Sequence, residues 1–374
     1  MTTKLATTPR VHSSESGKAS SILRWAPLLA LVWSLVYGLL GLFWANGGSG
    51  FPYGPAGDPS AELSLLAKST AEGTGPVIAV VGLVGVVVAW AMIVGWHTGT
   101  LRWVLLGVST VLALTLTMLL PDYRVLMTVA YTPILLIGSL FGWPDAFSLG
   151  DAYPWEVVNQ FILVAGGLVW AGATVYYWRQ SGSACVACGR RDGRDGWAPE
   201  TMASWGGWAT GAAVAIPLFY AATRFAWALG IPLGISTEFL REGQETGMWA
   251  AGAALASAAV VGAVLTLGLI RPWGEVFPRW VPFLAEKRVP PKAATIPASI
   301  VAAIVTSAGL MFIRLAIGGT FTIAGTNLIG GDNWAAIAPE LLWPLWGVAL
   351  AIATLAYHYR RRSTCDICGR GAET

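Results

Sequence analysis

Charged residues are scarce in this chain: only 11% of its 374 residues are Asp, Glu, Lys or Arg, whereas 55% are hydrophobic. Soluble domains carry about 25% charged residues, so this composition excludes an ordinary soluble globular protein. A mean hydropathy of +0.61 places the chain in the membrane class. The small net charge of +3 gives no basis for nucleic-acid binding. The lipid bilayer is therefore the first partner that we expect.

Residues for the common catalytic sites are also few. Histidine occurs only at His12, His97 and His358, and no two of these have the helical spacing of a haem or metalloprotease site. The sequence contains neither a phosphate-binding Gly-x-x-x-x-Gly-Lys-Ser/Thr loop nor a Gly-x-Ser-x-Gly nucleophile turn. All four cysteines fall into two Cys-x-x-Cys pairs, which leaves none as a separate nucleophile. The sequence does not decide whether the protein is an enzyme.

Long apolar runs are abundant, and about 20 apolar residues suffice to cross the hydrocarbon core of a membrane. They occur near residues 22–45, 76–96, 101–120, 157–178, 208–230, 248–270, 296–318 and 335–358. A shorter run, 125–142, contains Pro133 and is borderline. The expected fold class is an all-α integral membrane protein with eight transmembrane helices and one extra hydrophobic segment. Residues 1–21 are rich in Ser and Thr, which predicts a disordered cytoplasmic tail.

The two halves of the chain repeat one another in sequence. Arg102-Trp103-Val104 recurs in the second half as Arg279-Trp280-Val281. Around the cysteines, the residues that recur in order and at one constant spacing are Gly167, Ala171, Ala173, Thr174, Tyr177, Ser183, Cys185, Cys188, Gly189 and Arg190. Ordered matches of this kind indicate tandem duplication of a four-helix unit. The predicted repeats are 22–190 and 207–374, joined by a linker at 191–206.

The repeat raises a problem of parity. The second half has four clear apolar runs, which return the chain to its starting side, but the first half has five. The Arg-Trp-Val match pairs 103–119 with 280–296, which is too polar to cross a membrane. One of the two runs 101–120 and 125–142 therefore does not cross fully. The repeat indicates that 101–120 is the run that does not cross, whereas its greater length favours it as a span.

The distribution of Lys and Arg predicts the orientation. Basic residues gather in the connections 1–24, 97–102, 179–194, 271–292 and 359–370, and the positive-inside rule places such segments in the cytoplasm. The acidic or Gly-rich connections 46–74 and 231–247 then lie outside. We expect a multi-pass protein of the cell (inner) membrane. Its N-terminus, its C-terminus and both Cys-x-x-Cys elements are expected on the cytoplasmic side.

Two stretches carry a resemblance to known sequences. They are Tyr220-Ala-Ala-Thr-Arg224-Phe-Ala-Trp227-Ala-Leu-Gly-Ile-Pro232-Leu-Gly and Arg271-Pro-Trp-Gly-Glu-Val-Phe-Pro-Arg-Trp280. Over most of its second half, the chain resembles a group of uncharacterised multi-spanning membrane proteins of actinobacteria. The order of spans in each half is also similar to small four-helix membrane domains. The resemblance implies the architecture and no activity.

The Cys-x-x-Cys-Gly-Arg elements are the sharpest chemical signal. Each places two thiolates on one side of a tight loop, and two such loops supply the four sulfurs that tetrahedral Zn²⁺ prefers. We expect a structural zinc site shared by the halves and built from Cys185, Cys188, Cys365 and Cys368. Redox-active dithiols or two independent pairs are the alternatives. Structural disulfides are not expected in the reducing cytoplasm.

Charged residues within apolar runs give a second candidate site. Arg224, Arg314 and Glu340 lie toward the outer ends of runs in the second half, and charges at such positions are functional candidates. With Glu238 of the outer connection they are expected to form a binding cluster. The first half has Gly41 and Gln160 at the positions of Arg224 and Glu340, so the second half is expected to carry the task. A structural salt bridge or snorkelling of Arg to the headgroups is the alternative.

Three classes of function follow from these features. The leading one is a non-catalytic membrane protein, transporter-like or an assembly or accessory factor, with a cytoplasmic four-cysteine zinc site that joins the repeats. The second is a membrane enzyme or binding protein that acts on an anionic lipid or polyprenyl substrate at the outer Arg/Glu cluster. The third is a thiol-redox membrane protein. The polar residues within spans gather at the outer end, which favours binding or lipid chemistry over a path across the bilayer.

Overall fold

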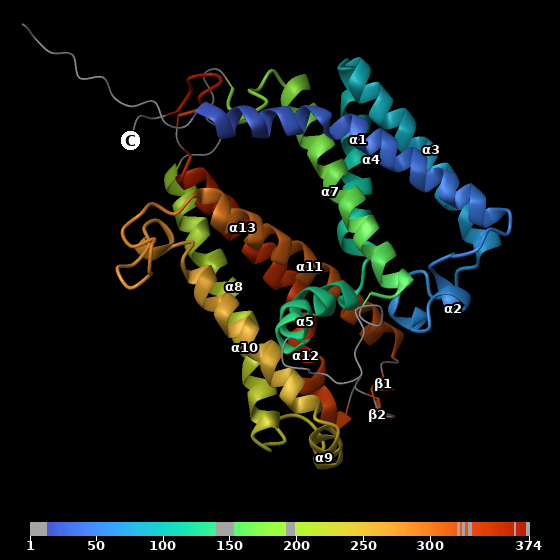
Figure 1. The fold of residues 1–374 in the computed structure, drawn as a ribbon, viewed down its shortest axis with the longest axis vertical. Coiled ribbons are helices and arrows are strands. Elements are labelled where there is room, and N and C mark those ends of the chain that lie inside the picture. Colours follow the sequence, from blue (N-terminus) through green and yellow to red (C-terminus); the bar gives the residue numbers. More distant parts are fainter. Residues whose placement is uncertain are drawn as a thin grey trace, which may run out of the picture.

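The computed structural model describes residues 13–139, 153–191, 199–319, 322–323, 326–327, 331–362 and 364–371. Helices dominate these residues (Figure 1). A small antiparallel hairpin of β1 (Thr322–Ile323) and β2 (Thr326–Asn327) is the one sheet in the described part of the chain. The helices form two groups, one from each half of the chain, so the protein is an α-helical membrane protein built of two bundles.

The first group contains four long helices. They are α1 (Ser13–Ala45), α3 (Ala71–Val94), α4 (Gly99–Leu114) and α7 (Trp155–Ser181). A π-helical turn, η2 (Thr115–Leu119), continues α4. Helix α1 packs against α3 and α7, and α4 packs against α7. The short α2 (Gly54–Gly57) and η1 (Ala61–Leu63) lie in the loop between α1 and α3. Trp44 and Trp170 are among the largest buried side chains of this core.

The second group has the same arrangement. Its long helices are α8 (Pro199–Ala228), α10 (Met248–Leu267), α11 (Pro291–Gly318) and α13 (Trp343–Arg360). Helix α8 packs against α10 and α13, and α11 packs against α13. The short elements are α9 (Thr237–Glu245), η3 (Pro272–Gly274), η4 (Gly331–Ala336) and α12 (Ala338–Leu341). In both groups, the first long helix thus packs against the second and the last, and the third packs against the last.

Individual contacts agree with this correspondence. Gly167 of α7 faces the third helix of its half, where an added Cβ atom would lie 3.0 Å from the Ala113 carbonyl oxygen. Gly347 of α13 faces α11, where an added Cβ atom would lie 2.6 Å from the Ala302 carbonyl oxygen. Ala113 of α4 and Ala302 of α11 therefore hold the same place against a glycine of the last long helix of their group, whereas the Arg-Trp-Val match had paired 103–119 with 280–296.

The structure distinguishes the two apolar runs 101–120 and 125–142 of the first half. The run 101–120 forms α4 and η2, which together are long and apolar enough to span, at Gly99–Leu119. The run 125–142 forms the 17-residue α5 (Tyr123–Ser139), which contains Pro133 and packs against α11 of the other half. Residues 140–142 of this run lie outside the described residues. Of the two runs, 101–120 is thus the one long and apolar enough to span, whereas the Arg-Trp-Val match had favoured it as the run that does not cross.

Six helices are long and apolar enough to cross a membrane, and only the described residues enter this comparison. They are Leu23–Ala45, Ala71–Val94, Gly99–Leu119, Trp155–Ser181, Met248–Leu267 and Pro291–Gly318. The expectation of eight spans is thus not supported. Helix α8 contains Arg224 and Pro217, which reduce its apolar character. Helix α13 begins only at Trp343, because the earlier part of the run 335–358 folds into the short η4 and α12.

The outer faces of the long helices are apolar. On α3, Val80, Leu83 and Val87 expose 61%, 64% and 58% of their surface. An apolar face of this kind is unfavourable in contact with water and favourable in contact with lipid chains. This exterior agrees with contact between the helices and a lipid bilayer.

Two predicted boundaries fall within helices. Helix α1 begins at Ser13, inside the predicted tail 1–21, and residues 1–12 lie outside the described residues. Helix α8 begins at Pro199, inside the predicted linker 191–206, of which residues 192–198 are not described. The described residues after α7, 182–191, and after α13, 361–362 and 364–371, lie at one end of the molecule, which we name the cysteine end (Figure 1). The loop that contains α2, at the right of Figure 1, and the loop that contains α9, at the bottom, each lie away from the cysteine end.

Candidate metal centre

Each Cys-x-x-Cys element folds into the same tight loop. In the first, the N–H of Gly189 donates to the carbonyl of Cys185 at 2.7 Å, and the N–H of Cys185 donates to the carbonyl of Arg190 at 3.0 Å. In the second, the same two bonds measure 2.8 and 2.9 Å and join the residues at positions 365, 369 and 370. Gly189 and Gly369 have φ values of +75° and +68°. Glycine adopts this left-handed conformation without the steric cost of a Cβ atom, which explains the Gly after each second cysteine.

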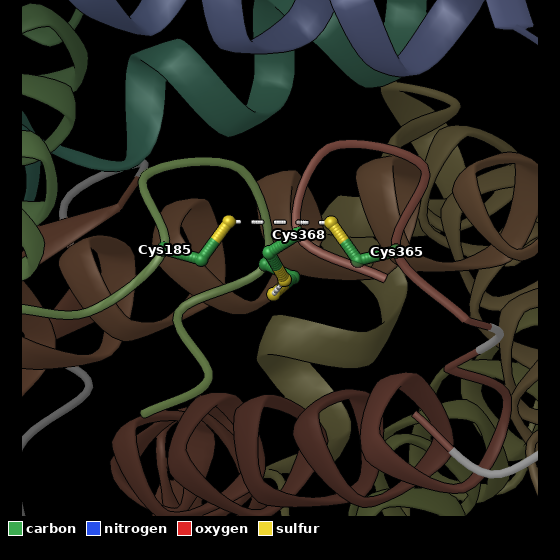
Figure 2. A group of neighbouring side chains, drawn as sticks. Cys185, Cys365 and Cys368 are labelled. Atoms are coloured by element: carbon green, nitrogen blue, oxygen red, sulfur yellow. Dashed lines mark hydrogen bonds between the residues drawn. The ribbon is translucent and has the colours of Figure 1, made fainter. Parts of the chain in front are cut away.

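The two loops meet although they belong to different halves of the chain. The Sγ atoms of Cys185 and Cys365 are 4.0 Å apart, and those of Cys188 and Cys368 are 3.6 Å apart. All four sulfurs lie within 4.8 Å of one another. Figure 2 shows the sulfurs of Cys185 and Cys365 pointing toward each other from the two loops. Zn–S bonds of about 2.3 Å at tetrahedral angles place sulfurs about 3.8 Å apart, so the four sulfurs can hold a metal ion.

Arginine side chains join the loops around the sulfurs. Arg190 donates from Nη1 to the carbonyl of Arg370 at 2.6 Å, and Arg370 donates from Nη1 to the carbonyl of Arg190 at 3.0 Å. Arg362 of the second half donates to the carbonyl of Cys188. Arg179 donates to the carbonyls of Val186 and Ala187 at 2.8 and 3.1 Å. These guanidinium groups satisfy the loop carbonyls and bring positive charge close to a set of thiolates.

The two thiols of the first loop differ in pKa because their surroundings differ. Burial favours the neutral form of Cys185, but hydrogen bonds to its sulfur from the N–H groups of Cys188 and Ala187 and from the thiols of Cys368 and Cys188 together outweigh burial and lower its pKa to about 7. Burial and the neighbouring cysteine sulfurs raise the pKa of Cys188 to about 12. A metal ion binds thiolates and displaces their protons. Without an ion, the four sulfurs cannot all be ionised so close together, because like charges repel.

The sulfur positions distinguish a metal site from disulfides. A disulfide bond needs an S–S distance of about 2.05 Å, whereas the closest pair here lies at 3.6 Å. All four cysteines are free, and Cys365 is buried while the other three are half-buried. Four sulfur ligands at tetrahedral spacing are typical of Zn²⁺ or of iron.

The second predicted site is brought together only in part. Arg224 of α8 and Glu340 of α12 form an ion pair, and both side chains are almost fully buried. The rings of Tyr220 and Trp227 lie 4.3 and 4.4 Å from the Arg224 guanidinium, which they enclose in cation–π contacts. Arg224 also donates to the carbonyl of Ala335 at 3.1 Å. This enclosure matches the structural salt bridge and leaves no open anion site at Arg224.

Arg314 and Glu238 do not join this pair. Arg314 extends toward the first half, where it donates to the carbonyls of Leu63 at 2.8 Å and Leu119 at 3.5 Å. Glu238 lies exposed on α9, where Ser236 caps the helix by accepting a bond from the N–H of Phe239. The predicted cluster of four is therefore reduced to a single ion pair. Its members lie on separate elements, and their sequence positions carried no information on how those elements pack.

A polar network in the first half was missed from the sequence. Arg124 bridges two buried carboxylates: it donates to both oxygens of Asp58, at 2.8 and 2.7 Å, and to Asp122 at 2.6 Å. Gln160 donates from Nε2 to Asp122 at 2.8 Å and accepts from its backbone N–H at 3.0 Å. The first half thus also carries charge at the end opposite the cysteines, contrary to the expected asymmetry. The signal was the short Pro121–Arg124 segment, in which an acid and a base interrupt two apolar runs.

Comparison with known proteins adds no identity. No family model, no curated protein and no solved structure matches this chain. The resemblance to actinobacterial membrane proteins therefore stays an expectation, and the function must be argued from the geometry.

Proposed function

We propose that this protein is a non-catalytic membrane protein of the assembly or accessory class, in which one zinc ion joins two duplicated halves. The observation that carries the proposal is the convergence of four cysteine sulfurs, two from each half, within 4.8 Å of one another. An ion at this point links segments that are far apart in the sequence, and its binding energy becomes energy of association of the halves. The site is structural, because four protein ligands complete a tetrahedron and leave no position for a substrate.

Zinc is the ion that best fits this set of ligands. Four thiolates in a tetrahedron select soft or borderline metals, and zinc sites of this kind use Cys-x-x-Cys loops. An iron–sulfur cluster would need inorganic sulfide between the cysteine sulfurs, and the short distances here favour a single ion. Four thiolates around Zn²⁺ carry a net charge of −2, which Arg179, Arg190, Arg362 and Arg370 offset.

Paired contacts support the duplication. The hydroxyl of Tyr177 donates to the carbonyl of Trp96, and the hydroxyl of Tyr357 donates to the carbonyl of Gly274 at 2.7 Å. In each half this bond joins the last long helix to the connection that follows the second long helix. The matched packing of Gly167 and Gly347 and the reciprocal bonds of Arg190 and Arg370 have the same form. Contacts that pair equivalent residues in both directions are typical of a two-fold axis, here passing close to the sulfurs.

The topology of the proposal places the cysteine end in the cytoplasm. Both Cys-x-x-Cys loops must lie on one side of the membrane, because their sulfurs touch. The basic connections 179–191 and 359–370 adjoin these loops, and the positive-inside rule assigns such segments to the cytoplasm of the cell (inner) membrane. The reducing cytoplasm keeps thiols available for zinc.

The alternative functions have less support. A lipid or polyprenyl site at the outer Arg/Glu cluster would need an accessible cation, but Arg224 is enclosed by Glu340 and two aromatic rings. A redox dithiol acts within one Cys-x-x-Cys pair, whereas here the sulfur contacts of 4.0 and 3.6 Å join different pairs and all four sulfurs form one cluster. A carrier lines a path with polar groups. In the described part of the chain, the buried ion pairs are Arg124 with Asp58 and Asp122, and Arg224 with Glu340, and each is closed on itself rather than part of a continuous polar path.

The test is the metal content of the purified full-length protein. We expect about one zinc per chain, with X-ray absorption showing four sulfur ligands at about 2.3 Å. Cys188→Ser and Cys368→Ser should lose the ion to the same extent, since each removes one ligand of the same site. Ala184→Ser, which adds a hydroxyl beside the first loop, should retain it. Two zinc ions per chain, or a loss in only one cysteine variant, would show separate sites and contradict the proposal.

A further inference from the structure

The connection between α10 and α11 is much longer than its counterpart in the first half. Residues 268–290 join these helices, whereas residues 95–98 join α3 and α4. The extra residues form a hairpin-like loop, which we name the roof loop, 275–289 (orange in Figure 1). The N–H of Phe277 donates to the carbonyl of Lys287, and the N–H of Glu286 donates to the carbonyl of Phe277, both at 3.0 Å. The loop therefore has backbone hydrogen bonds of its own and is not a simple linker.

The roof loop is tied to the cysteine end. Arg361 donates to the carbonyl of Val289 at 3.1 Å, and Arg360 donates to the carbonyl of Leu269 at 2.6 Å. Arg360 also lies 3.5 Å from the carboxylate of Glu275. These arginines shortly precede the second Cys-x-x-Cys loop. The roof loop therefore lies where the second bundle meets the membrane surface on the side of the cysteines.

A cavity of about 750 Å³ lies between this loop and the helices. Gly262 and Leu265 of α10 and Pro297 and Val301 of α11 line its depth. Trp273 and Trp280 line it at the roof loop. Nearly all of these surfaces are apolar, and the volume falls in the range of about 300–1,000 Å³ found for ligand pockets. The cavity suits a flexible hydrocarbon chain.

The residues that adjoin the cavity lining in the sequence are basic and aromatic. Arg271, Arg288 and Lys292 lie close in sequence to lining residues, and none forms an ion pair within the described residues. Trp280 and Phe283 expose 82% and 93% of their surface. Exposed aromatic rings beside Lys and Arg are typical of the membrane–water interface. The acids of the roof loop do not cancel this charge, since Glu286 pairs with Arg279 and Glu275 lies against Arg360.

We propose that this cavity binds an anionic phospholipid, with an acyl chain between α10 and α11 and the headgroup phosphate at Arg271, Arg288 and Lys292. An apolar depth with a cationic rim complements a hydrocarbon chain attached to a negative headgroup. Basic pockets between membrane helices bind anionic headgroups in this way. A neutral lipid would fill the cavity without using the three cations. The inference stands independently of the zinc site.

The experiment is photo-crosslinking of the full-length protein in phosphatidylcholine vesicles. One sample contains a trace of phosphatidylglycerol with a diazirine on its acyl chain, and the other contains phosphatidylcholine with the same diazirine. We expect the phosphatidylglycerol probe to label the peptides around Gly262 and Val301 in excess of the phosphatidylcholine probe. Because each basic residue near the surface contributes on the order of a fivefold preference, Arg288→Gln with Lys292→Gln should remove most of this excess.

A filling variant separates a bound lipid from general contact with the bilayer. An added Cβ atom at Gly262 meets no atom within 4 Å, so Gly262→Phe should fold and occupy the cavity. Gly107→Phe is the matched control, because Gly107 of α4 is equally unobstructed and does not line the cavity. We expect Gly262→Phe to lose the specific labelling and Gly107→Phe to keep it. Equal labelling by both probes, or labelling that Gly262→Phe leaves unchanged, would overturn the proposal, as would no labelling by either.

Discussion

Arg190 and Arg370 exchange hydrogen bonds: each guanidinium donates to the backbone carbonyl of the other residue, at 2.6 and 3.0 Å. The exchange joins the equivalent residues that come two positions after the second cysteine of each loop. These two bonds connect the loops through guanidinium groups and backbone carbonyls, whereas a metal ion would connect them through the four sulfurs. The junction of the two cysteine loops therefore includes two sets of interactions that can be removed separately.

Removal of the metal should loosen the junction measurably. A zinc chelator is expected to lower the thermal midpoint of the purified protein by on the order of 5 °C, because an ion that binds only the folded state stabilises it by mass action. Intrinsic tryptophan fluorescence in detergent measures the midpoint. Cys188→Ser should start at the lower midpoint and not respond to the chelator. A response of this variant as large as that of the wild type would show that the chelator acts elsewhere.

The orientation can be tested with two introduced cysteines in the second half. Leu229 and Trp280 expose 78% and 82% of their surface, and they lie at opposite ends of the helices. In intact cells, a membrane-impermeant maleimide should label Leu229→Cys directly and Trp280→Cys only after permeabilisation, because basic loops stay in the cytoplasm. The protein with its four native cysteines is the control for background labelling. The reverse pattern would invert the topology, and labelling of both in intact cells would refute the predicted separation.

Close helix packing at Gly167 and Gly347 should make both intolerant of a methyl group. Added Cβ atoms would lie 3.0 and 2.6 Å from the carbonyl oxygens of Ala113 and Ala302. We expect Gly167→Ala and Gly347→Ala to destabilise the protein by about 1–3 kcal/mol, with the larger loss at Gly347. Gly211→Ala is the control, because no atom lies within 4 Å of its added Cβ, and its stability should be equal or higher. Unfolding in mixed micelles gives the comparison, and equal effects at all three sites would contradict it.

The buried pair Arg224–Glu340 should depend on both partners. Arg224→Met leaves the Glu340 carboxylate buried without a cation, which is expected to cost about 3–5 kcal/mol. Arg224→Met combined with Glu340→Met should recover most of the loss, since neither charge is then buried. The exposed pair Arg241–Glu245, at 3.9 Å, is the control, and its Arg241→Met variant should change stability by less than about 1 kcal/mol. A single Arg224→Met as stable as the wild type would show that Glu340 finds another partner.

Much of the architecture followed from local sequence. Apolar runs located the long helices, because the cost of unpaired backbone groups in lipid forces a spanning segment into a helix whatever surrounds it. The cysteine loops were predictable for the same reason: Cys-x-x-Cys-Gly sets a local turn, and Gly189 and Gly369 take the φ values that the turn requires. The convergence of the four sulfurs was predicted from the repeat and is confirmed as a cluster able to hold a metal ion.

Other features depended on how distant elements meet. The Arg-Trp-Val match paired 103–119 with 280–296, whereas in the structure α4 and α11 are the helices that meet Gly167 and Gly347 of the last long helix of their groups. Arg314 was expected to join Glu340, yet its guanidinium reaches Leu63 and Leu119 of the other half. A residue's side-chain partners depend on the rotation and crossing of its helix, which a single hydrophobic pattern does not specify.

The sequence by itself determined the membrane class, the positions of the long helices and the identity of the candidate metal-ligating residues, because each depends on composition or on contacts within a few residues. Tertiary structure decided which charges are paired and where the apolar cavity lies. Those outcomes depend on how helices distant in the sequence are brought side by side. The network of Asp58, Arg124 and Asp122 is the clearest case, since its three charges are ordinary in sequence and become one buried unit only when α5 and the loop before α3 come together.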